Sequence, residues 1–351
     1  MFEELNKIIE HNDTITPIKF MENSDVIYAG ILPDDNFNKL DQSKYFKVTQ
    51  GNGLTIFKAK NFTLKENYII FCHTLFIDSL FKHLENIHEL KNLKLITSQT
   101  DIPITKNLFN KKPNCIRQWF SINVSFSNNN LIPIPLGIVG DGNKKNLAPD
   151  NLIKINLNKQ RENKIYFNFN LNTNYFHRIS AMKRSLKIQD AVIDKPTMEL
   201  GEYVKKLSHY KYNVTPWGNG FDTHRLWESL YLGCVPITKF HKTFKNMQDL
   251  PIIFVSDYKD ISLDMVNKYK FESINIEKLK FSWWLNLIQS HTIENQSKEI
   301  NINENEEVNK ESIKLFYAKY HKNEKRKKYA TFFRKLHKKI LGKKINTLVG
   351  V

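Results

Sequence analysis

The chain has 351 residues, of which 41% are apolar and 25% are charged, and this size and composition indicate a globular, soluble protein with two domains. No apolar run reaches the roughly 18 residues of a membrane-spanning helix, and the polar, acidic first residues do not resemble a secretion signal. The three cysteines lie far apart, which argues against a disulfide framework and a zinc site. We expect Cys72, Cys115 and Cys234 to be buried thiols in a cytoplasmic protein.

The net charge of +17 is unevenly distributed. Residues 313–351 contain 13 Lys and Arg against one acid, Glu324, so this segment carries +12 and the other 312 residues carry +5. The body of the protein is therefore only mildly basic, and the tail needs its own explanation.

Short apolar runs alternate with runs of helical period, which is the pattern of βαβ units and parallel sheets. In the first half we predict buried strands at 25–30, 68–74 and 93–98, a helix at 76–87 and an extended segment at 131–138. The extended segment, LIPIPLGI, contains prolines, which exclude a helix there. In the second half we predict strands at 164–170, 190–194, 211–216, 235–240 and 251–258, and helices at 175–186, 197–210 and 223–232.

The repeated pattern predicts two Rossmann-like domains that face each other across a ligand cleft. We place the domains at 1–150 and 151–290, joined through the polar stretch 140–151. The polar residues 291–312 are predicted to be a linker, with an exposed helix as the alternative. In the tail, 313–351, the residues Tyr329, Phe332, Phe333, Leu336 and Ile340 form one apolar stripe on a basic amphipathic helix.

One stretch, WGNGFDTHRLWESLYLGCVPI at 217–237, concentrates ionisable residues at the start of a helix. A strand, a glycine loop and a helix N-terminus together attract phosphate, because unpaired N–H groups and the helix dipole favour an anion. His224, Arg225 and Glu228 can share one face of this helix. Arg225 opposes the dipole preference in the first turn, and a bound phosphate would explain it. A solvated helix face with a simple ion pair is an equally good explanation from these residues alone.

The same stretch resembles the nucleotide-sugar-binding motif of the exostosin-like glycosyltransferases, bacterial and viral members included, which are GT-B enzymes. The family pattern is Pro-x-Gly-x-Gly-x-Asp-x-x-Arg-x-Trp-Glu-(Ser/Ala)-Leu, followed by Gly-Cys-(Ile/Val)-Pro. The positions that match are Pro216, Gly218, Gly220, Asp222, Arg225, Trp227, Glu228, Gly233, Cys234 and Pro236. Fainter similarity covers IYFNFNLNTNYFHR (165–178), LITSQTDIPI (95–104), RQWFSINV (117–124) and LIPIPLGI (131–138).

The resemblance implies a two-domain GT-B fold, with an acceptor domain at 1–150 and a donor domain at 151–290. It implies that Glu228 binds the donor ribose and that Arg225 and Arg178 contact the diphosphate. The donor-binding set would be Arg178, Trp217, Gly218, Asn219, Gly220, Asp222, His224, Arg225 and Glu228. Relatives often carry Arg where this chain has Trp217, so one cation is missing. Trp217 either stacks on the base or packs beneath the loop.

An inverting transfer needs a general base near the acceptor hydroxyl. Asp101, just past the strand at 93–98, is the first candidate and His73 the second. The competing interpretations are a turn aspartate before Pro103 and a packed core histidine. No Asp-x-Asp motif stands in a metal-binding setting, so we expect a metal-independent enzyme without a cofactor.

Taken together, the sequence predicts a glycosyltransferase, a hexosyl- or pentosyltransferase of polysaccharide biosynthesis, that moves a sugar from a UDP-linked donor to a glycan or lipid-linked acceptor. The alternatives are a fucosyltransferase-like GT-B enzyme that uses a GDP-sugar and a non-catalytic, basic surface-binding protein on a degenerate GT-B scaffold. For the tail, 313–351, an anionic membrane surface on the cytoplasmic face is the favoured partner. Packing of the tail on the body is the alternative. A nucleic-acid partner is not expected, because the mildly basic body has no groove-reading motif.

Overall fold

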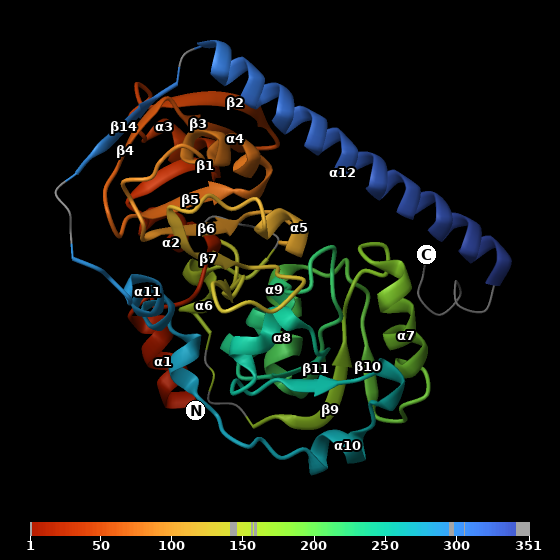
Figure 1. Ribbon diagram of the computed structural model, residues 1–351. Helices are drawn as coiled ribbons and strands as arrows, with labels where there is room; N and C mark the ends of the chain where they lie inside the picture. Colours follow the sequence, from red (N-terminus) through yellow and green to blue (C-terminus); the bar gives the residue numbers. More distant parts are fainter. Residues whose placement is uncertain are drawn as a thin grey trace. The chain divides into compact units, whose positions relative to one another are not determined.

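The computed structural model describes residues 2–140, 146–155, 157, 160–294, 298–304 and 306–341. Within these ranges the chain forms two compact units (Figure 1). The N-terminal unit contains residues 16–135 and 282–323, and the C-terminal unit contains the chain up to Ile15, residues 136–281 and the chain from Glu324 onward. The units are therefore interleaved along the sequence and differ from the contiguous ranges that we predicted, because the chain passes between them more than once.

A seven-stranded mixed sheet forms the N-terminal unit, in the order β2-β3-β1-β5-β6-β7-β8. Five strands run parallel, namely β1 (Val26–Pro33), β5 (Ile69–His73), β6 (Leu93–Ser98), β7 (Ile116–Ser121) and β8 (Leu131–Pro133). The hairpin of β2 (Tyr45–Gly51) and β3 (Leu54–Ala59) adds an antiparallel edge. β5 and β6 are buried along their whole length, as expected for central strands covered on both faces.

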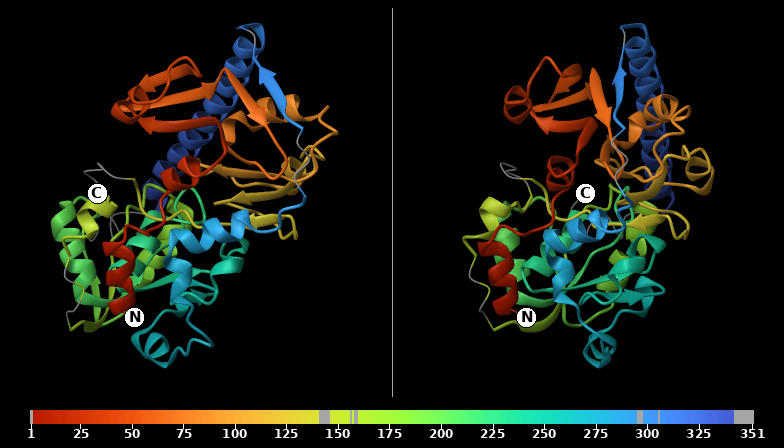
Figure 2. Two further views of the ribbon diagram at one scale, coloured as in Figure 1. Left: turned by 90° about the vertical axis from the view of Figure 1, so that its left-hand side faces the viewer. Right: turned by 60° about the vertical axis from the view of Figure 1, so that its left-hand side comes forward.

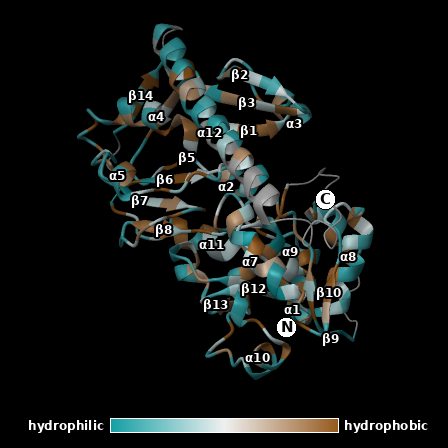
Figure 3. Ribbon diagram, turned by 90° about the vertical axis from the view of Figure 1, so that its right-hand side faces the viewer, coloured by the Kyte–Doolittle hydropathy of each residue, from teal (hydrophilic) through white to brown (hydrophobic). Residues whose placement is uncertain are grey.

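The helices of this unit connect or flank the strands. They are α2 (Pro17–Glu22), α3 (Asp34–Asn38), η1 (Thr74–Phe76), α4 (Ile77–Leu84) and α5 (Lys106–Phe109), with α11 (Phe281–Gln289) following the crossing from the other unit. α4 has Ile77, Leu80, Phe81 and Leu84 buried on one face, which confirms the helix predicted at 76–87. The apolar residues concentrate on the strands, whereas hydrophilic residues predominate along α12 (Glu306–Leu341) (Figure 3).

The segment predicted as a linker, 291–312, contains regular structure among its described residues. β14 (Ile300–Asn303) pairs antiparallel with β4 (Asn61–Leu64), and α12 begins at Glu306 (Figure 2). The alternation of Ile300 and Ile302 with asparagines suits an edge strand with one apolar face. The strand was not predicted, because the surrounding residues are mostly polar and the alternation covers only four residues.

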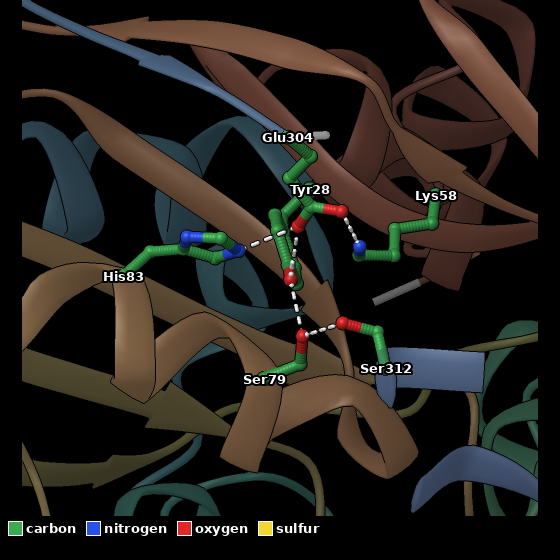
Figure 4. A network of polar contacts seen from close by, with 6 residues as sticks. All are labelled: Tyr28, Lys58, Ser79, His83, Glu304 and Ser312. Atoms are coloured by element: carbon green, nitrogen blue, oxygen red, sulfur yellow. Dashed lines mark hydrogen bonds and ion pairs between the residues drawn. The ribbon is translucent and has the colours of Figure 1, made fainter. Parts of the chain in front are cut away.

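A buried polar cluster joins β14 to the core of the N-terminal unit (Figure 4). The carboxylate of Glu304 forms an ion pair with Lys58, and both side chains have 0% exposure. Glu304 also accepts a hydrogen bond from Tyr28 (3.0 Å) and lies 2.5 Å from His83 Nε2. The Tyr28 hydroxyl continues to Ser79 at 2.8 Å, and Ser79 bonds Ser312 at the start of α12. β14 and the first turns of α12 are thus tied to this unit through charge as well as through strand pairing.

Five parallel strands form the sheet of the C-terminal unit, in the order β10-β9-β11-β12-β13. They are β9 (Glu162–Phe167), β10 (Ala191–Ile193), β11 (Tyr210–Val214), β12 (Val235–Lys239) and β13 (Ile253–Val255). The helices are α1 (Phe2–Glu10), α6 (Pro149–Leu152), α7 (Tyr175–Ser185), α8 (Leu200–His209), α9 (His224–Tyr231), η2 (Lys242–Met247), η3 (Tyr258–Asp260), α10 (Leu263–Lys268) and η4 (Ile276–Leu279). Each strand and helix predicted for this half is present, and the α/β class with a parallel sheet is confirmed. This arrangement is compatible with a Rossmann-like fold.

Two further predictions bear on the chain as a whole. All three cysteines are free and buried. Among the described residues, no helix has both the length and the apolarity to cross a bilayer. Of the connection predicted at 140–151, residues 141–145 lie outside the described ranges, and α6 begins at Pro149.

Candidate functional site

The glycine-rich stretch lies at the carboxyl edge of the five-stranded sheet, at its topological switch point. β9 stands between β10 and β11, so the chain leaves β9 toward one neighbour and later returns to the other. The connections that follow β9 and β11 therefore start side by side, and α/β sheets bind ligands at this point. The first connection leads into α7 with Arg178, and the second is the loop 215–222 that leads into α9.

Arg178 joins these two connections. Its guanidinium donates from Nε to the carbonyl oxygen of Trp217 (2.9 Å), from Nη1 to Asn170 (2.6 Å) and from Nη2 to Pro216 (3.3 Å). The side chain is buried, and burial followed by the nearby charge of Arg225 lowers the pKa of Arg178 to about 10. Three of its five N–H donors are thus given to backbone carbonyls, and Arg178 fixes the loop.

The loop itself presents Asn219 to solvent between the buried Gly218 and Gly220. Asn174, at the start of α7, donates through Nδ2 to the carbonyl oxygen of Gly218 at 2.5 Å. A Cβ added at Gly218 would meet its nearest neighbours at 3.5 Å, which is an ordinary contact. Packing within the protein therefore does not require glycine at 218, whereas the close approach of a ligand to the backbone would.

Asp222 is buried and anchors the start of α9. Its carboxylate accepts hydrogen bonds from the indole N–H of Trp227 (2.9 and 3.0 Å) and from the backbone N–H groups of Thr223 (2.8 Å) and Leu136 (2.8 Å). Burial raises the pKa of Asp222 to about 7, and the three donors oppose that shift. The geometry gives Asp222 a structural part in the motif.

His224, the first residue of α9, is turned toward the segment 136–138. Its Nδ1 lies 2.8 Å from the carbonyl oxygen of Gly137 and donates to it. Gly137 has φ +73°, and a Cβ there would lie 2.1 Å from the carbonyl oxygen of Ile15, so only glycine fits. Asp222 and His224 together hold the chain where it enters the C-terminal unit.

The other end of α9 holds two more crossings of the chain. Tyr231 accepts a hydrogen bond from Ile15 N (2.8 Å) and donates to the carbonyl oxygen of Leu279 (2.7 Å). The N–H of Phe281 donates to the carbonyl oxygen of Asp13 at 2.7 Å. The crossings at 15/16, 135/136 and 281/282 are therefore all fixed, on the side of the C-terminal unit, to the helix that carries the motif.

Glu228 is buried one turn into α9, and its carboxylate accepts a hydrogen bond from the hydroxyl of Tyr203 on α8 (2.9 Å). The backbone N–H of Leu147 is a longer donor at 3.4 Å. Burial and then the charge of Glu228 raise the pKa of Tyr203 well above its usual value, so the hydroxyl stays protonated and donates. A carboxylate has about four acceptor positions, so Glu228 keeps acceptor capacity for further donors.

Arg225 lies beside this pair. Its guanidinium carbon is 5.7 Å from the centre of the Tyr203 ring, within cation–π range. The side chain is half-buried, and its Nε is buried without a hydrogen-bond partner in the ranges that the structure describes. A buried donor without a partner is uncommon and calls for an explanation, and an anionic ligand would supply one.

Trp217 packs in an aromatic cluster, which agrees with the second alternative for this residue. Its ring centre lies 5.2 Å from Phe221, 5.2 Å from His177 and 5.4 Å from His241, and its N–H donates to the carbonyl oxygen of Lys239 (3.1 Å). Burial lowers the pKa of both histidines, that of His241 to about 4. The cluster is neutral near pH 7, so these imidazoles supply no cation at this position.

The two candidate bases lie in the N-terminal unit. Asp101 is exposed and follows β6 after a short turn. His73, at the end of β5, is buried, and burial lowers its pKa to about 3. Its ring contacts Phe76 and Phe316, with ring centres 6.0 and 6.5 Å away. This is the packed core histidine that the sequence left open, and an imidazole held neutral inside the core does not suit proton transfer to solvent-borne substrates.

Sequence reasoning overlooked three contributors to this region, Tyr203, Tyr231 and Asn174. Tyr203 and Tyr231 lie in the helices predicted at 197–210 and 223–232, and a buried tyrosine hydroxyl usually needs a partner. The need of a buried tyrosine hydroxyl for a partner was the only feature of the sequence that pointed to these residues. In the described part of the chain, no cluster of three or more His, Cys, Asp or Glu side chains could hold a metal ion.

Comparison with known proteins adds no relative: no protein-family model matches the chain, and no curated protein matches it.

Proposed function

We propose that the chain is a two-domain GT-B glycosyltransferase that transfers a sugar from a nucleotide-diphosphate donor, UDP-linked, to a glycan or lipid-linked acceptor. The observation that carries the proposal is the position of the motif. Arg178, the glycine loop and the N-terminus of α9 meet at the switch point of a parallel sheet, where such folds bind nucleotides. The resemblance of residues 216–236 to the exostosin-like motif supports the same site.

Arg225 is the residue that we assign to the diphosphate. It is partly exposed, it lies in the first turn of α9, and its buried Nε lacks a protein partner among the described residues. A guanidinium and a helix N-terminus together offset the charge of a leaving nucleotide. Arg178 supports this electrostatic role from beneath the loop, because its carbonyl contacts leave its positive charge in place.

We assign Glu228 to binding of the ribose hydroxyls of the nucleotide donor. Its carboxylate is held by Tyr203 and retains lone pairs that can accept bonds from two vicinal hydroxyls. Asn219 and Trp217 border the same edge of the sheet. In the acceptor-binding unit, Asp101 remains the candidate general base, because it is exposed at the carboxyl end of a parallel strand.

Binding of nucleotides to the full chain tests the proposal directly. Thermal unfolding would be followed with UDP, GDP, ADP and CDP, for wild type and for Arg225→Ala and Glu228→Gln. Wild type is expected to gain stability with UDP, and each variant is expected to lose at least about tenfold in affinity, because one charge-assisted contact or one bidentate acceptor is removed. Arg117→Ala removes an exposed guanidinium in the other unit and is the matched control.

The panel also separates the alternatives. A response to GDP in place of UDP favours the fucosyltransferase-like enzyme. The absence of a response to every nucleotide would remove the donor site and favour the non-catalytic surface-binding protein. Loss of the UDP response in Arg117→Ala as well would show that the effect is general electrostatics. Product analysis with a panel of donor sugars then identifies the transferred group.

A further inference from the structure

α12 is one continuous helix, and its first half is docked on the N-terminal unit. Phe316 is buried and stacks on Phe76, with ring centres 4.8 Å apart and planes 13° apart. Ser312 bonds Ser79 in the buried cluster, and Lys319 pairs with Asp78 at 2.5 Å. These contacts anchor the first half of α12 on the N-terminal unit.

The second half has a different composition. Residues 325–341 contain eight Lys and Arg and no acid, and the backbone stays helical to Leu341. Tyr329 and Phe332, three residues apart on one side of the helix, are 65% and 61% exposed. Two large, mostly exposed aromatic rings on this basic helix leave apolar surface in contact with water. An aromatic face flanked by lysines is instead typical of helices that lie in a lipid headgroup region.

We propose that residues 324–341 of α12 bind the surface of an anionic lipid bilayer, with Tyr329 and Phe332 entering the headgroup region and the flanking Lys and Arg contacting acidic lipids. Charge complementarity selects this partner over a neutral membrane, because the attraction acts between basic residues and a negative surface potential. The exposed aromatic pair selects a bilayer over a nucleic acid, since a phosphate backbone recruits cations without needing an apolar helix face. This surface is independent of the proposed catalytic function.

Co-sedimentation of the full chain with sucrose-loaded vesicles tests the proposal. Two lipid mixtures would be compared, phosphatidylcholine alone and phosphatidylcholine with about 30 mol% phosphatidylglycerol, which sets the negative surface potential. Wild type is expected to sediment with the anionic vesicles only, and less at high salt because the attraction is screened. The quadruple variant Lys325→Gln, Arg326→Gln, Lys327→Gln and Lys328→Gln is expected to bind at least about 100-fold more weakly.

The matched control removes the same charge elsewhere. Lys39, Lys106, Lys111 and Lys187 are exposed and scattered over both units, and all four would be changed to Gln. This control should bind vesicles as wild type does. An equal loss in both quadruple variants would overturn the proposal in favour of a net-charge effect. Tyr329→Ser with Phe332→Ser should weaken binding at least about fivefold while all charges are kept.

Two other results would also overturn the proposal. One is unchanged vesicle binding in both the quadruple tail variant and the aromatic double variant. The other is tighter binding to a DNA duplex than to anionic vesicles at the same ionic strength, which would assign the helix to nucleic acid. Helix content by circular dichroism and the unfolding temperature are measured for each variant, so that lost binding is not confused with a lost fold.

Discussion

Two of the places where the molecule buries charge hold that charge in different ways. In the N-terminal unit, Glu304 and Lys58 neutralise each other inside the core, with His83 and Tyr28 completing the contacts of the carboxylate. In the motif of the C-terminal unit, Asp222 accepts from backbone and indole N–H groups. Arg178 there donates to backbone carbonyls. The first cluster pairs opposite charges, whereas the second holds charges with neutral dipoles.

This difference separates a structural cluster from a candidate binding site. A buried ion pair is electrically self-contained, so it fixes the docking of β14 and leaves no field for a ligand. Charges held by dipoles remain uncompensated, and they can act on a charged ligand that binds beside them. Arg225 can act on such a ligand directly, because its buried Nε lacks a partner in the described residues.

The largest expected effect comes from breaking the ion pair. Glu304→Ala leaves Lys58 buried without its counter-ion, and we expect the N-terminal unit to lose about 3–5 kcal/mol of unfolding free energy. Burial lowers the pKa of Lys58 to about 7, which is the direction expected when a positive charge is removed from water. Hydrogen exchange of the amides in β14 and β4 gives a local measurement, because these strands pair next to Glu304.

Two comparisons sharpen this prediction. The double variant Lys58→Met with Glu304→Leu replaces both charges by apolar groups and should recover most of the lost stability. Asp264→Ala breaks an exposed pair with Lys268 and should change stability by less than about 0.5 kcal/mol. A loss for Glu304→Ala as small as that of Asp264→Ala would show that the cluster is not a structural ion pair.

Asp222→Asn tests the second cluster and should cost about 1–3 kcal/mol, because an amide N–H₂ replaces one acceptor and faces a buried donor. The pH dependence has a definite sign. The folded-state pKa of Asp222 is raised to about 7 from 3.8, so the folded protein binds more protons than the unfolded chain between these values. This group therefore makes wild type less stable as pH rises from about 4 to about 7.

The variant lacks that group, so the stability gap between wild type and Asp222→Asn should narrow over the same pH interval. Urea unfolding of both proteins at several pH values measures this difference in unfolding free energy. A gap that widens with rising pH would mean that the N–H donors outweigh burial and that the pKa lies below its usual value.

The sequence was sufficient for the motif and for the parallel strands other than β7, because buried strands are continuous apolar runs and glycines mark the loop. It was insufficient for the hairpin of β2 and β3, although Asn52 and Gly53 form a turn with positive φ at both positions. The Asn-Gly dipeptide is the strongest short-range signal for a hairpin, and it was available. The β14–β4 pairing could not be predicted, since it joins segments about 240 residues apart.

Prediction of the site shows the same contrast between local patterns, which the sequence reveals, and long-range contacts, which it does not. The type and spacing of residues located Arg225 and Glu228 at the start of α9. They could not reveal that Asp222 and Arg178 would be enclosed by the backbone of their own unit. That depends on which carbonyl and N–H groups the fold brings near, and it involves Leu136 and Asn170, which are 86 and 8 residues away along the chain. Hydrogen bonds from distant backbone groups produce no recognisable sequence pattern around the side chains that they contact.

Tyr203→Phe has the smallest expected effect and tests whether the dipole-held charges serve a ligand. It removes the hydrogen bond to Glu228 (2.9 Å) and keeps the ring over which Arg225 lies. We expect a loss of about 0.5–1.5 kcal/mol in stability and a several-fold weaker response to UDP, smaller than that of Glu228→Gln. Tyr45→Phe, on a half-buried ring in the other unit, should leave both quantities unchanged. If Tyr203→Phe lowered stability but left nucleotide affinity equal to wild type, Glu228 would hold α8 against α9 and would not be a ribose ligand.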